Sequence, residues 1–257
     1  MNSSVGTFVW FELLTNDGPA AQAFYRAVIG WEFADSGMTD RSYSIISKGP
    51  FRVGGMMPIS PEMAAGGARP LWMGYIAVDD VDALAARLVA TGGRILRPGE
   101  DIPGVGRFAV VADPQAAPFV LFKGIPPPQP MPVVAPGSPG HVGWHEFVSA
   151  SPSTFAWYSA LFGWTKGETM DMGALGTYQI FNINGVMAGG MASSNAQSPP
   201  PFWLYYISVG NIDSAVERIT AAKGRILLAP HAVPGGSWIV HALDPQGAFF
   251  ALAGPRA

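Results

Sequence analysis

FYRAVIGW at residues 24–31 returns in altered form as WYSALFGW at residues 157–164, 133 positions further along the chain. Both stretches carry a tyrosine at the second position, a short apolar run and a closing Gly-Trp step. Similarity that returns at a long, fixed spacing is the sequence signature of a duplicated architecture. The two stretches therefore predict that the chain contains two copies of one fold.

Five more blocks recur in the same order and at nearly the same spacing. They pair Gly6–Glu12 with Gly140–Glu146, Gly54–Met56 with Gly189–Met191, Tyr75–Val78 with Tyr206–Val209, Gly93–Leu96 with Gly224–Leu227, and Asp113–Gln115 with Asp244–Gln246. Six ordered blocks are not a chance match, so we predict two domains, at residues 1–125 and 140–257. Residues 126–139 contain seven prolines, which favour an extended polyproline linker.

The composition narrows the range of functions. Hydrophobic residues make up 49% of the chain and charged residues 13%, which is typical of a protein that buries a sizeable core. The net charge of −3 gives no basic footprint for nucleic acid or a membrane surface. The absence of cysteine excludes thiolate catalysis and cysteine-ligated metals. No signal peptide and no apolar run long enough to span a membrane is evident, so we expect a cytoplasmic protein.

Within each copy, the residue pattern predicts two βαβββ units. Thr7–Leu14 is rich in β-formers, Asp17 and Pro19 suit a helix start, and Gly30 suits its end. A segment rich in Pro, Gly and Ala, from Pro58 to Pro70, is expected to be a loop. The pattern restarts at Trp72–Asp79, and a second helix follows it. Four such units predict an α+β fold, in which curved mixed sheets carry helices on one face and a cleft on the other.

These motifs resemble the vicinal oxygen chelate superfamily, which includes glyoxalase I, extradiol dioxygenases, fosfomycin-resistance enzymes and bleomycin-binding proteins. The resemblance rests on AFYRAVIGW and AWYSALFGW, on YIAVDDVDAL, and on VVADPQAAPFVLF and HALDPQGAFFAL, which together span nearly the whole chain. It implies tandem glyoxalase-like domains with two curved mixed sheets, each enclosing a cleft for a small molecule. It also implies either a monomer with an internal pseudo-dimer or a homodimer.

The resemblance further implies where a divalent metal would bind, since family enzymes place His, Glu or Gln at these positions. In this chain the corresponding residues are Trp10, Tyr75, Val120 and Gly55-Met56 in copy one, and Trp144, Tyr206, Ala251 and Gly190-Met191 in copy two. Divalent metals favour imidazole, carboxylate or thiolate ligands. We therefore expect no metal cofactor at the inherited position.

The four histidines all lie in copy two, at positions 141, 145, 231 and 241. His145 and Glu146 are adjacent on an expected strand, so their side chains point to opposite faces. His241 corresponds to Val110 in copy one, which argues against a duplicated role. A divalent metal held in domain 2 by His241 and Glu146 stays open as an alternative.

Aromatic rings and carboxylates fill the expected cleft instead. Strand alternation places Trp10 with Glu12, and Trp144 with Glu146, on one face, and the resemblance implies that Tyr75 and Tyr206 lie across from them. Three interpretations of the glutamates are open: a general base, a partner for a ligand cation, or a hydrogen bond to tyrosine or backbone that locks the sheet. Likewise Met56 and Met191 either line an apolar pocket or fill the core.

The remaining repeated motifs have structural explanations. The Asp-Pro pairs at 113–114 and 244–245 are typical of turns, and the paired glycines indicate a bulge or close packing. Three functions follow as hypotheses. The first is a protein that binds an apolar or aromatic compound, and its expected ligand contacts are Trp10, Tyr75, Trp144, Tyr206, Met56, Met191 and His241. The second is a metal-independent lyase, isomerase or hydroxylase that uses Glu12 or Glu146, and the third is a metal-dependent lyase or dioxygenase with a rearranged site in copy two.

Overall fold

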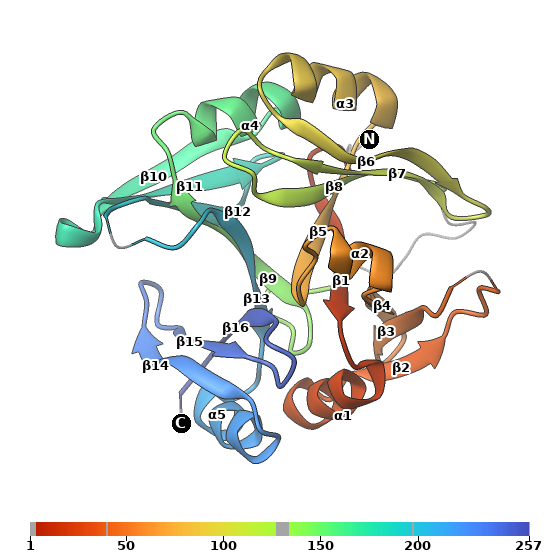
Figure 1. Cartoon of the computed structure of the whole chain (residues 1–257). Coiled ribbons are helices and arrows are strands. Elements are labelled where there is room, and N and C mark those ends of the chain that lie inside the picture. The colour runs from red at the N-terminus through yellow and green to blue at the C-terminus, as the bar shows by residue number, and fades with distance from the viewer. Residues whose placement is uncertain (1–3, 40, 127–133, 197, 257) are drawn as a thin grey trace. The chain divides into compact units, whose positions relative to one another are not determined.

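A computed structural model describes residues 4–39, 41–126, 134–196 and 198–256 of the chain. The elements of copy one are β1 (Phe8–Thr15), α1 (Gly18–Ile29), β2 (Glu32–Asp35), β3 (Ser44–Lys48), β4 (Phe51–Pro58), α2 (Pro61–Ala65), β5 (Leu71–Ala77), α3 (Val81–Ala90), β6 (Arg94–Ile102), β7 (Gly106–Ala112) and β8 (Pro118–Gly124) (Figure 1). Those of copy two are β9 (Val142–Ala150), α4 (Thr154–Phe162), β10 (Thr165–Asp171), the 3-10 turn η1 (Gly173–Leu175), β11 (Thr177–Ile183), β12 (Val186–Ser193), β13 (Phe202–Ser208), α5 (Ile212–Ala221), β14 (Arg225–Ala232), β15 (Trp238–Leu243) and β16 (Phe249–Gly254).

The strands form two eight-stranded mixed sheets, which confirms the predicted α+β fold. Their orders are β2-β3-β4-β1-β5-β8-β7-β6 and β10-β11-β12-β9-β13-β16-β15-β14. Both orders follow one pattern, so the sequence duplication is also a duplication of topology. In each repeated unit the first strand pairs in parallel with the last, as β1 does with β4 and β13 with β16, and the neighbours beyond are antiparallel.

The helix ends follow the sequence signals. The Asp17 carboxylate accepts from the Ala20 backbone N–H at 3.0 Å, and Gly30 ends α1 with φ 74°. Left-handed geometry of this kind favours glycine. In copy two, Gly163 ends α4 with φ 72°. Helix α4 begins at Thr154 and has no side-chain cap, unlike α1, which Asp17 caps. Helix α2 lies in a segment that the sequence pattern assigned to a loop, and Ser60 caps it by accepting from the Met63 N–H.

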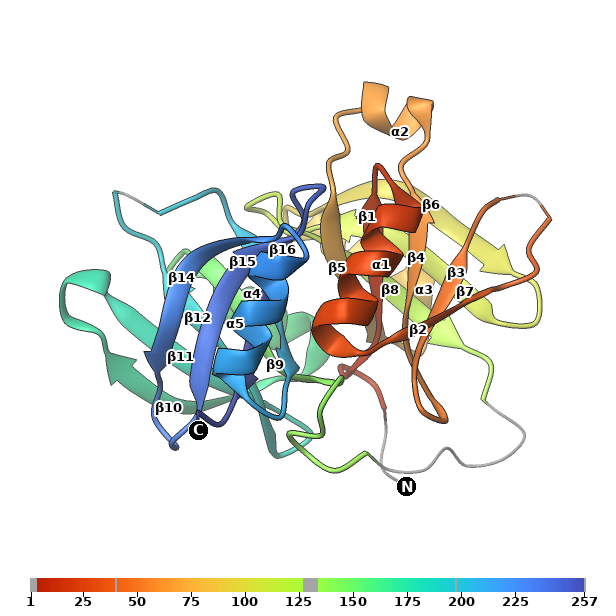
Figure 2. The same cartoon turned by 90° about the horizontal axis from the view of Figure 1, so that it is seen from below.

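By its contacts the chain divides into two compact units, and each unit takes one half from each copy. Unit 1 comprises residues 1–9, 74–133 and 144–203, and unit 2 comprises residues 10–73, 134–143 and 204–257. In unit 1, α3 packs on β6, β7 and β8 (Figure 1). In unit 2, α5 packs on β14, β15 and β16 and contacts α1 (Figure 2).

A buried chain of hydrogen bonds joins the two halves of unit 2. The Trp72 indole N–H donates to the Tyr25 hydroxyl at 2.9 Å, and that hydroxyl donates to the Asp244 carboxylate at 3.2 Å. The other Asp244 oxygen accepts from the Gln246 and Ala248 backbone N–H groups, each at 2.9 Å. Asp244 thus shapes its Asp-Pro turn, as predicted, and also binds a tyrosine from the other copy.

Unit 1 contains the equivalent series of hydrogen bonds, but here the tryptophan and tyrosine come from copy two and the aspartate from copy one. Trp203 donates to the Tyr158 hydroxyl at 3.0 Å, and Tyr158 donates to the Asp113 carboxylate at 3.2 Å. Burial raises the pKa of both aspartates. Burial and the nearby Asp244 charge hold the pKa of Tyr25 well above its usual value, so this phenol keeps its proton and remains a donor.

Most of the predicted polyproline linker, residues 127–133, lies outside the described residues. Of the remainder, Ala135–Ser138 forms a turn in which the Ser138 N–H donates to the Ala135 carbonyl at 3.1 Å. Among the helices of the described ranges, none combines the length and the apolar composition that crossing a membrane requires.

Candidate functional site

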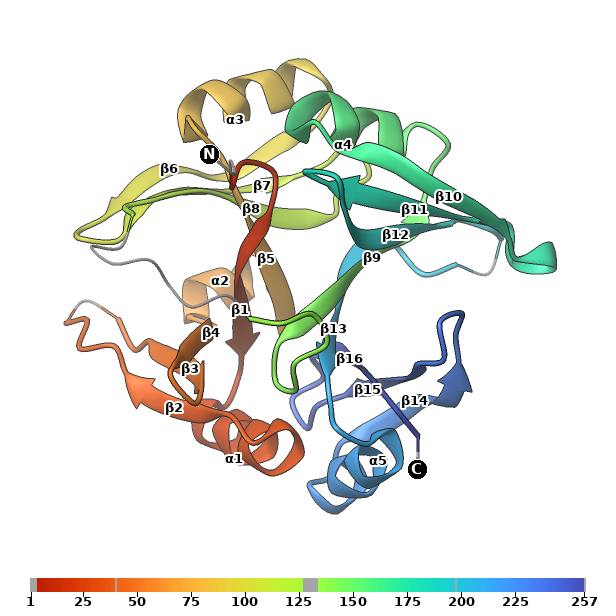
Figure 3. The same cartoon turned by 180° about the vertical axis from the view of Figure 1, so that it is seen from behind.

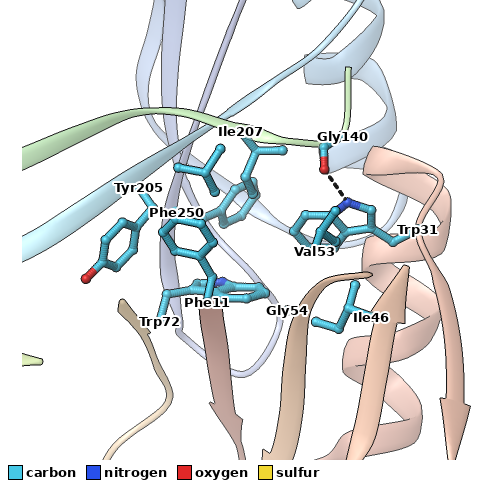
Figure 4. Close-up of a pocket in the computed structure, with 11 residues that line it drawn as sticks. Phe11, Trp31, Ile46, Val53, Gly54, Trp72, Gly140, Tyr205, Ile207 and Phe250 are labelled. Atoms are coloured by element: carbon cyan, nitrogen blue, oxygen red, sulfur yellow. Dashed lines mark hydrogen bonds between the residues drawn. The ribbon is translucent and has the colours of Figure 1, made fainter. Parts of the chain in front are cut away.

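The first strand of each copy places a tryptophan and a glutamate on one face of its sheet. In β1, Trp10 and Glu12 lie on the face opposite Phe11, whose ring lines a buried void of unit 2 together with Trp31 and Trp72 (Figure 4). We call the face that carries Glu12, or Glu146 in copy two, the carboxylate face, and the other the helix face. The predicted alternation along β1 is confirmed.

A tyrosine completes each group, from just before β3 in copy one and from β11 in copy two. The Trp10 indole N–H donates to the Tyr43 hydroxyl at 3.0 Å, and that hydroxyl donates to the Glu12 carboxylate. In copy two, Trp144 donates to Tyr178 at 2.8 Å, and Tyr178 donates to the Glu146 carboxylate at 3.2 Å. We call these groups the first cluster (Trp10, Tyr43, Glu12) and the second cluster (Trp144, Tyr178, Glu146).

The electrostatics of both clusters keep the phenols protonated. Burial, together with the charge of Glu12 or Glu146, raises the pKa of Tyr43 and of Tyr178. Each tyrosine hydroxyl therefore accepts from an indole and donates to a carboxylate. Each glutamate carboxylate thus accepts a hydrogen bond from a protonated phenol in both copies.

The repeated glycines explain how the tyrosine rings fit. A Cβ atom on Gly55 would lie 1.8 Å from the Tyr43 hydroxyl oxygen, and one on Gly190 would lie 2.1 Å from the Tyr178 ring. Gly55 is in register with Glu12 and Gly190 with Glu146, so each tyrosine lies over the glycine beside its glutamate. This confirms the close packing predicted from the glycine pairs.

Tyr43 and Tyr178 were missed by the sequence reasoning. They lie outside the matched blocks, in segments where neither strand alternation nor helix periodicity marks them. One signal was available: the two tyrosines occupy equivalent places before the paired glycines, 135 residues apart.

Tyr206 and His241 form a separate pair on the carboxylate face of unit 2. The neighbours of Tyr206 in β13, Tyr205 and Ile207, line the buried void, so Tyr206 points the other way. Its hydroxyl lies 2.8 Å from the His241 Nε2 atom. Burial and the nearby His231 lower the pKa of His241 to about 4, so at neutral pH the imidazole is uncharged and its tautomer sets which of the two groups donates.

Tyr75, the copy-one counterpart of Tyr206, has no histidine beside it in β7. It lies in β5, in register with Val120, and its ring meets Phe122 edge-on with centroids 5.8 Å apart. Val110, the counterpart of His241, pairs with Val120 in β8. The two copies thus share their Trp–Tyr–Glu clusters and differ at this pair.

Met56 and Met191 lie on the helix face, away from the clusters. Met56 is in register with the core residue Leu13, and its methyl group lies near Gly18 at the start of α1. Met191 is in register with Phe147, which is fully buried. Both methionines are nearly inaccessible to solvent, which suits core packing.

His145 also lies apart from the second cluster. Its ring stacks on Phe8 with centroids 4.2 Å apart, and its Nδ1 atom lies 2.8 Å from the Ala188 carbonyl. Burial lowers the pKa of His145 to about 4. Its place in the structure is that of a half-buried, uncharged histidine.

The residues at the positions that hold metal in family enzymes do not fit a divalent ion. Indole, glycine, valine and alanine side chains offer no ligand, and Tyr43 and Tyr178 cover the glycines. Within the described ranges, no three His, Asp or Glu side chains gather closely enough to hold a metal. The void in Figure 4 has a volume of about 10 Å³ and apolar walls, so it is a packing defect with room for one water at most.

Comparison with known proteins agrees with this fold. Residues 140–252 match the family model described as Glyoxalase/Bleomycin resistance protein/Dioxygenase superfamily, and residues 7–49 match the model described as Bleomycin resistance protein-like N-terminal. The matched ranges fall in both copies, so each copy is similar to proteins of this superfamily.

Two relatives match this chain over nearly their whole length. The protein named "Putative glyoxylase CFP32" of Mycobacterium tuberculosis is 29% identical over 253 residues, covering 97% of this chain and 95% of that protein. Anthracycline biosynthesis protein DnrV of Streptomyces peucetius is 28% identical over 263 residues, covering 96% and 92%.

Among solved structures, the Mn(II)-bound glyoxalase from Novosphingobium aromaticivorans superposes with a TM-score of 0.65 at 14% identity, covering 98% of this chain and 83% of that chain. The 2,2',3-trihydroxybiphenyl 1,2-dioxygenase of Sphingomonas wittichii gives 0.67 at 11% identity, covering 97% and 90%. Identities this low establish a shared fold and nothing about chemistry.

Proposed function

We propose that this protein binds a planar, hydroxylated aromatic small molecule against the carboxylate face of its sheets, without a metal ion. The observation that carries the proposal is the Trp–Tyr–Glu cluster, which occurs in both copies with the same order of hydrogen bonds. Trp10, Tyr43, Trp144 and Tyr178 are only half-buried, so part of each ring is open to a ligand.

The cluster chemistry selects the ligand class. Tryptophan and tyrosine rings bind flat aromatic compounds by stacking and by apolar contact. A carboxylate accepts at several lone-pair sites, and a phenolic hydroxyl of a ligand is a donor of matching chemistry. Two relatives are named as anthracycline biosynthesis proteins, and anthracyclines contain planar, hydroxylated fused rings. That relationship supports the same ligand class here.

The binding test uses 1,4-dihydroxyanthraquinone as the probe. Its titration into the protein is expected to quench tryptophan fluorescence and to raise Tm, because a ligand stabilises the state that it binds. We expect Trp10→Phe and Trp144→Phe each to weaken binding about threefold to tenfold, the range of one aromatic contact. Trp238→Phe is the matched control, since Trp238 lies on the opposite face of β15 from His241.

Two results would contradict the proposal. One is equal affinity in the wild type and in the Trp10→Phe/Trp144→Phe double variant. The other is a stoichiometric content of Mn, Fe, Ni or Zn, measured by elemental analysis of protein purified without chelators. Either result would move the site away from the clusters or assign it to a metal.

A second candidate function is metal-independent acid–base chemistry on such a compound. The observation that favours it is the burial of Glu12, which is 6% exposed and receives the Tyr43 proton donor. A shielded carboxylate of this kind suits a general base. Glu12→Gln and Glu146→Gln keep the shape and remove the base, so unchanged turnover of a substrate in both variants would exclude this candidate.

A further inference from the structure

A groove of about 300 Å³ opens in unit 1 between α4 and the ladder β10–β11–β12. Figure 3 shows α4 lying along this ladder (Figure 3). Thr177 and Gln179 line the groove, and Tyr178 between them points to the other face of β11. The groove is therefore on the helix face and is separate from the second cluster. Its volume falls at the lower end of the range for small-molecule sites.

The lining combines one cation with neutral polar groups and an apolar floor. Lys166 is the only charged side chain among the described lining residues, and none of them is acidic. Its ammonium lies 5.5 Å from the centre of the Phe155 ring, which holds the charge at the groove. Thr177, Ser193 and the buried Met191 also line the space, and the Ser193 hydroxyl accepts from the Thr177 backbone N–H at 2.7 Å.

Copy one shows that the fold does not require this opening. At the place that corresponds to Phe155 and Gln179, the Gln22 side-chain amide donates to the Ser44 hydroxyl at 3.1 Å and ties α1 to β3. The counterpart of Lys166 is Phe33, which the Arg26 guanidinium covers at 5.3 Å. In copy one, side chains of the helix and the strand thus bond to each other at this place. In copy two, the same place is a groove that contains a lysine.

We infer that this groove binds a small organic anion, with its carboxylate or phosphate group on Lys166 and the hydroxyls and its apolar part on Phe155 and Met191. An anion bound here would pair with the Lys166 ammonium and accept hydrogen bonds from hydroxyl groups, and no carboxylate among the lining residues would repel it. The site differs from the proposed aromatic site in face, charge and residues. The two therefore bind independently.

The test compares three probes that share one ring: benzoate, phenyl phosphate and neutral benzyl alcohol, each titrated by isothermal calorimetry or by NMR of the full-length protein. We expect saturable binding of at least one anion and none of benzyl alcohol at the same concentrations. A preference for benzoate assigns the group to a carboxylate, and a preference for phenyl phosphate assigns it to a phosphate ester. Binding is expected to weaken as salt is raised.

Two variants locate the binding. Lys166→Gln is expected to weaken anion binding about threefold to fivefold, in the range of a partly exposed ion pair, whereas Lys123→Gln, an exposed lysine of β8, leaves it unchanged. The double variant Phe155→Gln/Gln179→Ser copies the Gln22–Ser44 bridge and is expected to abolish binding. Its circular dichroism and Tm report whether it folds.

Tyr178→Phe separates this site from the aromatic site, because it changes the second cluster and leaves the groove intact. Anion binding that persists in Tyr178→Phe supports a separate groove. Equal binding by Lys166→Gln and Lys123→Gln, or equal binding of benzoate, phenyl phosphate and benzyl alcohol, would overturn the inference.

Discussion

Removal of the Tyr25 hydroxyl is the sharpest test of how unit 2 is held together. This hydroxyl is fully buried, accepts from Trp72 at 2.9 Å and donates to Asp244 at 3.2 Å. Tyr25→Phe leaves the ring in place, so the core loses little volume. The buried Trp72 N–H loses its partner, and one oxygen of Asp244 loses its tyrosine donor.

The magnitude follows from these two losses. A buried donor left without a partner costs about 1–3 kcal/mol, and a hydrogen bond to a carboxylate contributes a further 1–2 kcal/mol or so. Asp244 keeps both of its backbone hydrogen bonds through its other oxygen. The cost of losing the tyrosine hydrogen bond to this carboxylate is therefore limited. We expect Tyr25→Phe to lower the free energy of unfolding by about 2–4 kcal/mol. Tyr158→Phe removes the equivalent hydroxyl of unit 1, so it is expected to cost a similar amount.

The assay is equilibrium unfolding in urea, followed by tryptophan fluorescence and by far-UV circular dichroism. Coincident curves from the two probes justify reading a single free energy. Tyr43→Phe is the comparison variant, because Tyr43 makes the same kind of indole and carboxylate contacts but is half-buried, whereas Tyr25 is fully buried. We expect less than about 1 kcal/mol for this variant.

A double-mutant cycle with Asp244→Asn tests the bond itself. The asparagine keeps the oxygen that accepts from the backbone and changes the atom that faces Tyr25. The coupling energy is expected to exceed about 0.5 kcal/mol. The reasoning is refuted if Tyr25→Phe costs no more than Tyr43→Phe, or if the Tyr25 and Asp244 substitutions are simply additive.

Two further predictions concern the carboxylate face. Gly55→Ala places a methyl group 1.8 Å from the Tyr43 hydroxyl oxygen, so we expect it to cost about 1–3 kcal/mol in a Tm or urea measurement; Gly210→Ala, which meets no atom within 4 Å, is the control, and equal effects would contradict the packing. The pKa of His241 is about 4 in the fold and near 6.5 when unfolded, so the unfolded state binds more protons between these values and stability falls as the pH falls. From pH 7 to pH 5 this histidine is expected to cost at most about 2 kcal/mol; His241→Val removes that part of the pH dependence, and an unchanged dependence would exclude a buried, neutral His241.

The sequence predicted those parts of the fold that depend on local pattern. The duplication, the α+β class, the helix ends at Asp17 and Gly30, and the faces of Trp10 and Glu12 follow from spacing, capping and strand alternation. Each of these signals involves residues near one another in the chain or repeats of the same block. The turn role of Asp244 is of the same kind, since its backbone partners lie within four residues.

Features that depend on distant residues were not predicted. Tyr25 and Asp244 are 219 positions apart, and no local pattern relates them. Tyr43 joins Trp10 and Glu12 only because β3 folds back beside β4, which in turn lies beside β1. Helix α2 was missed for another reason: its Ser60-Pro61 start was readable as a cap, but the surrounding Gly and Ala residues suggested a loop.

The exchange of halves between the copies has a consequence for how this protein evolves. Tyr25 depends on an aspartate encoded more than two hundred codons later, and Tyr158 depends on Asp113 in the earlier copy. After the gene duplicated, neither copy was free to drift alone, because a change in one is tested against its partner in the other. A chimera that replaces a single copy with that of a distant relative is therefore expected to fail unless it preserves both tyrosine–aspartate matches.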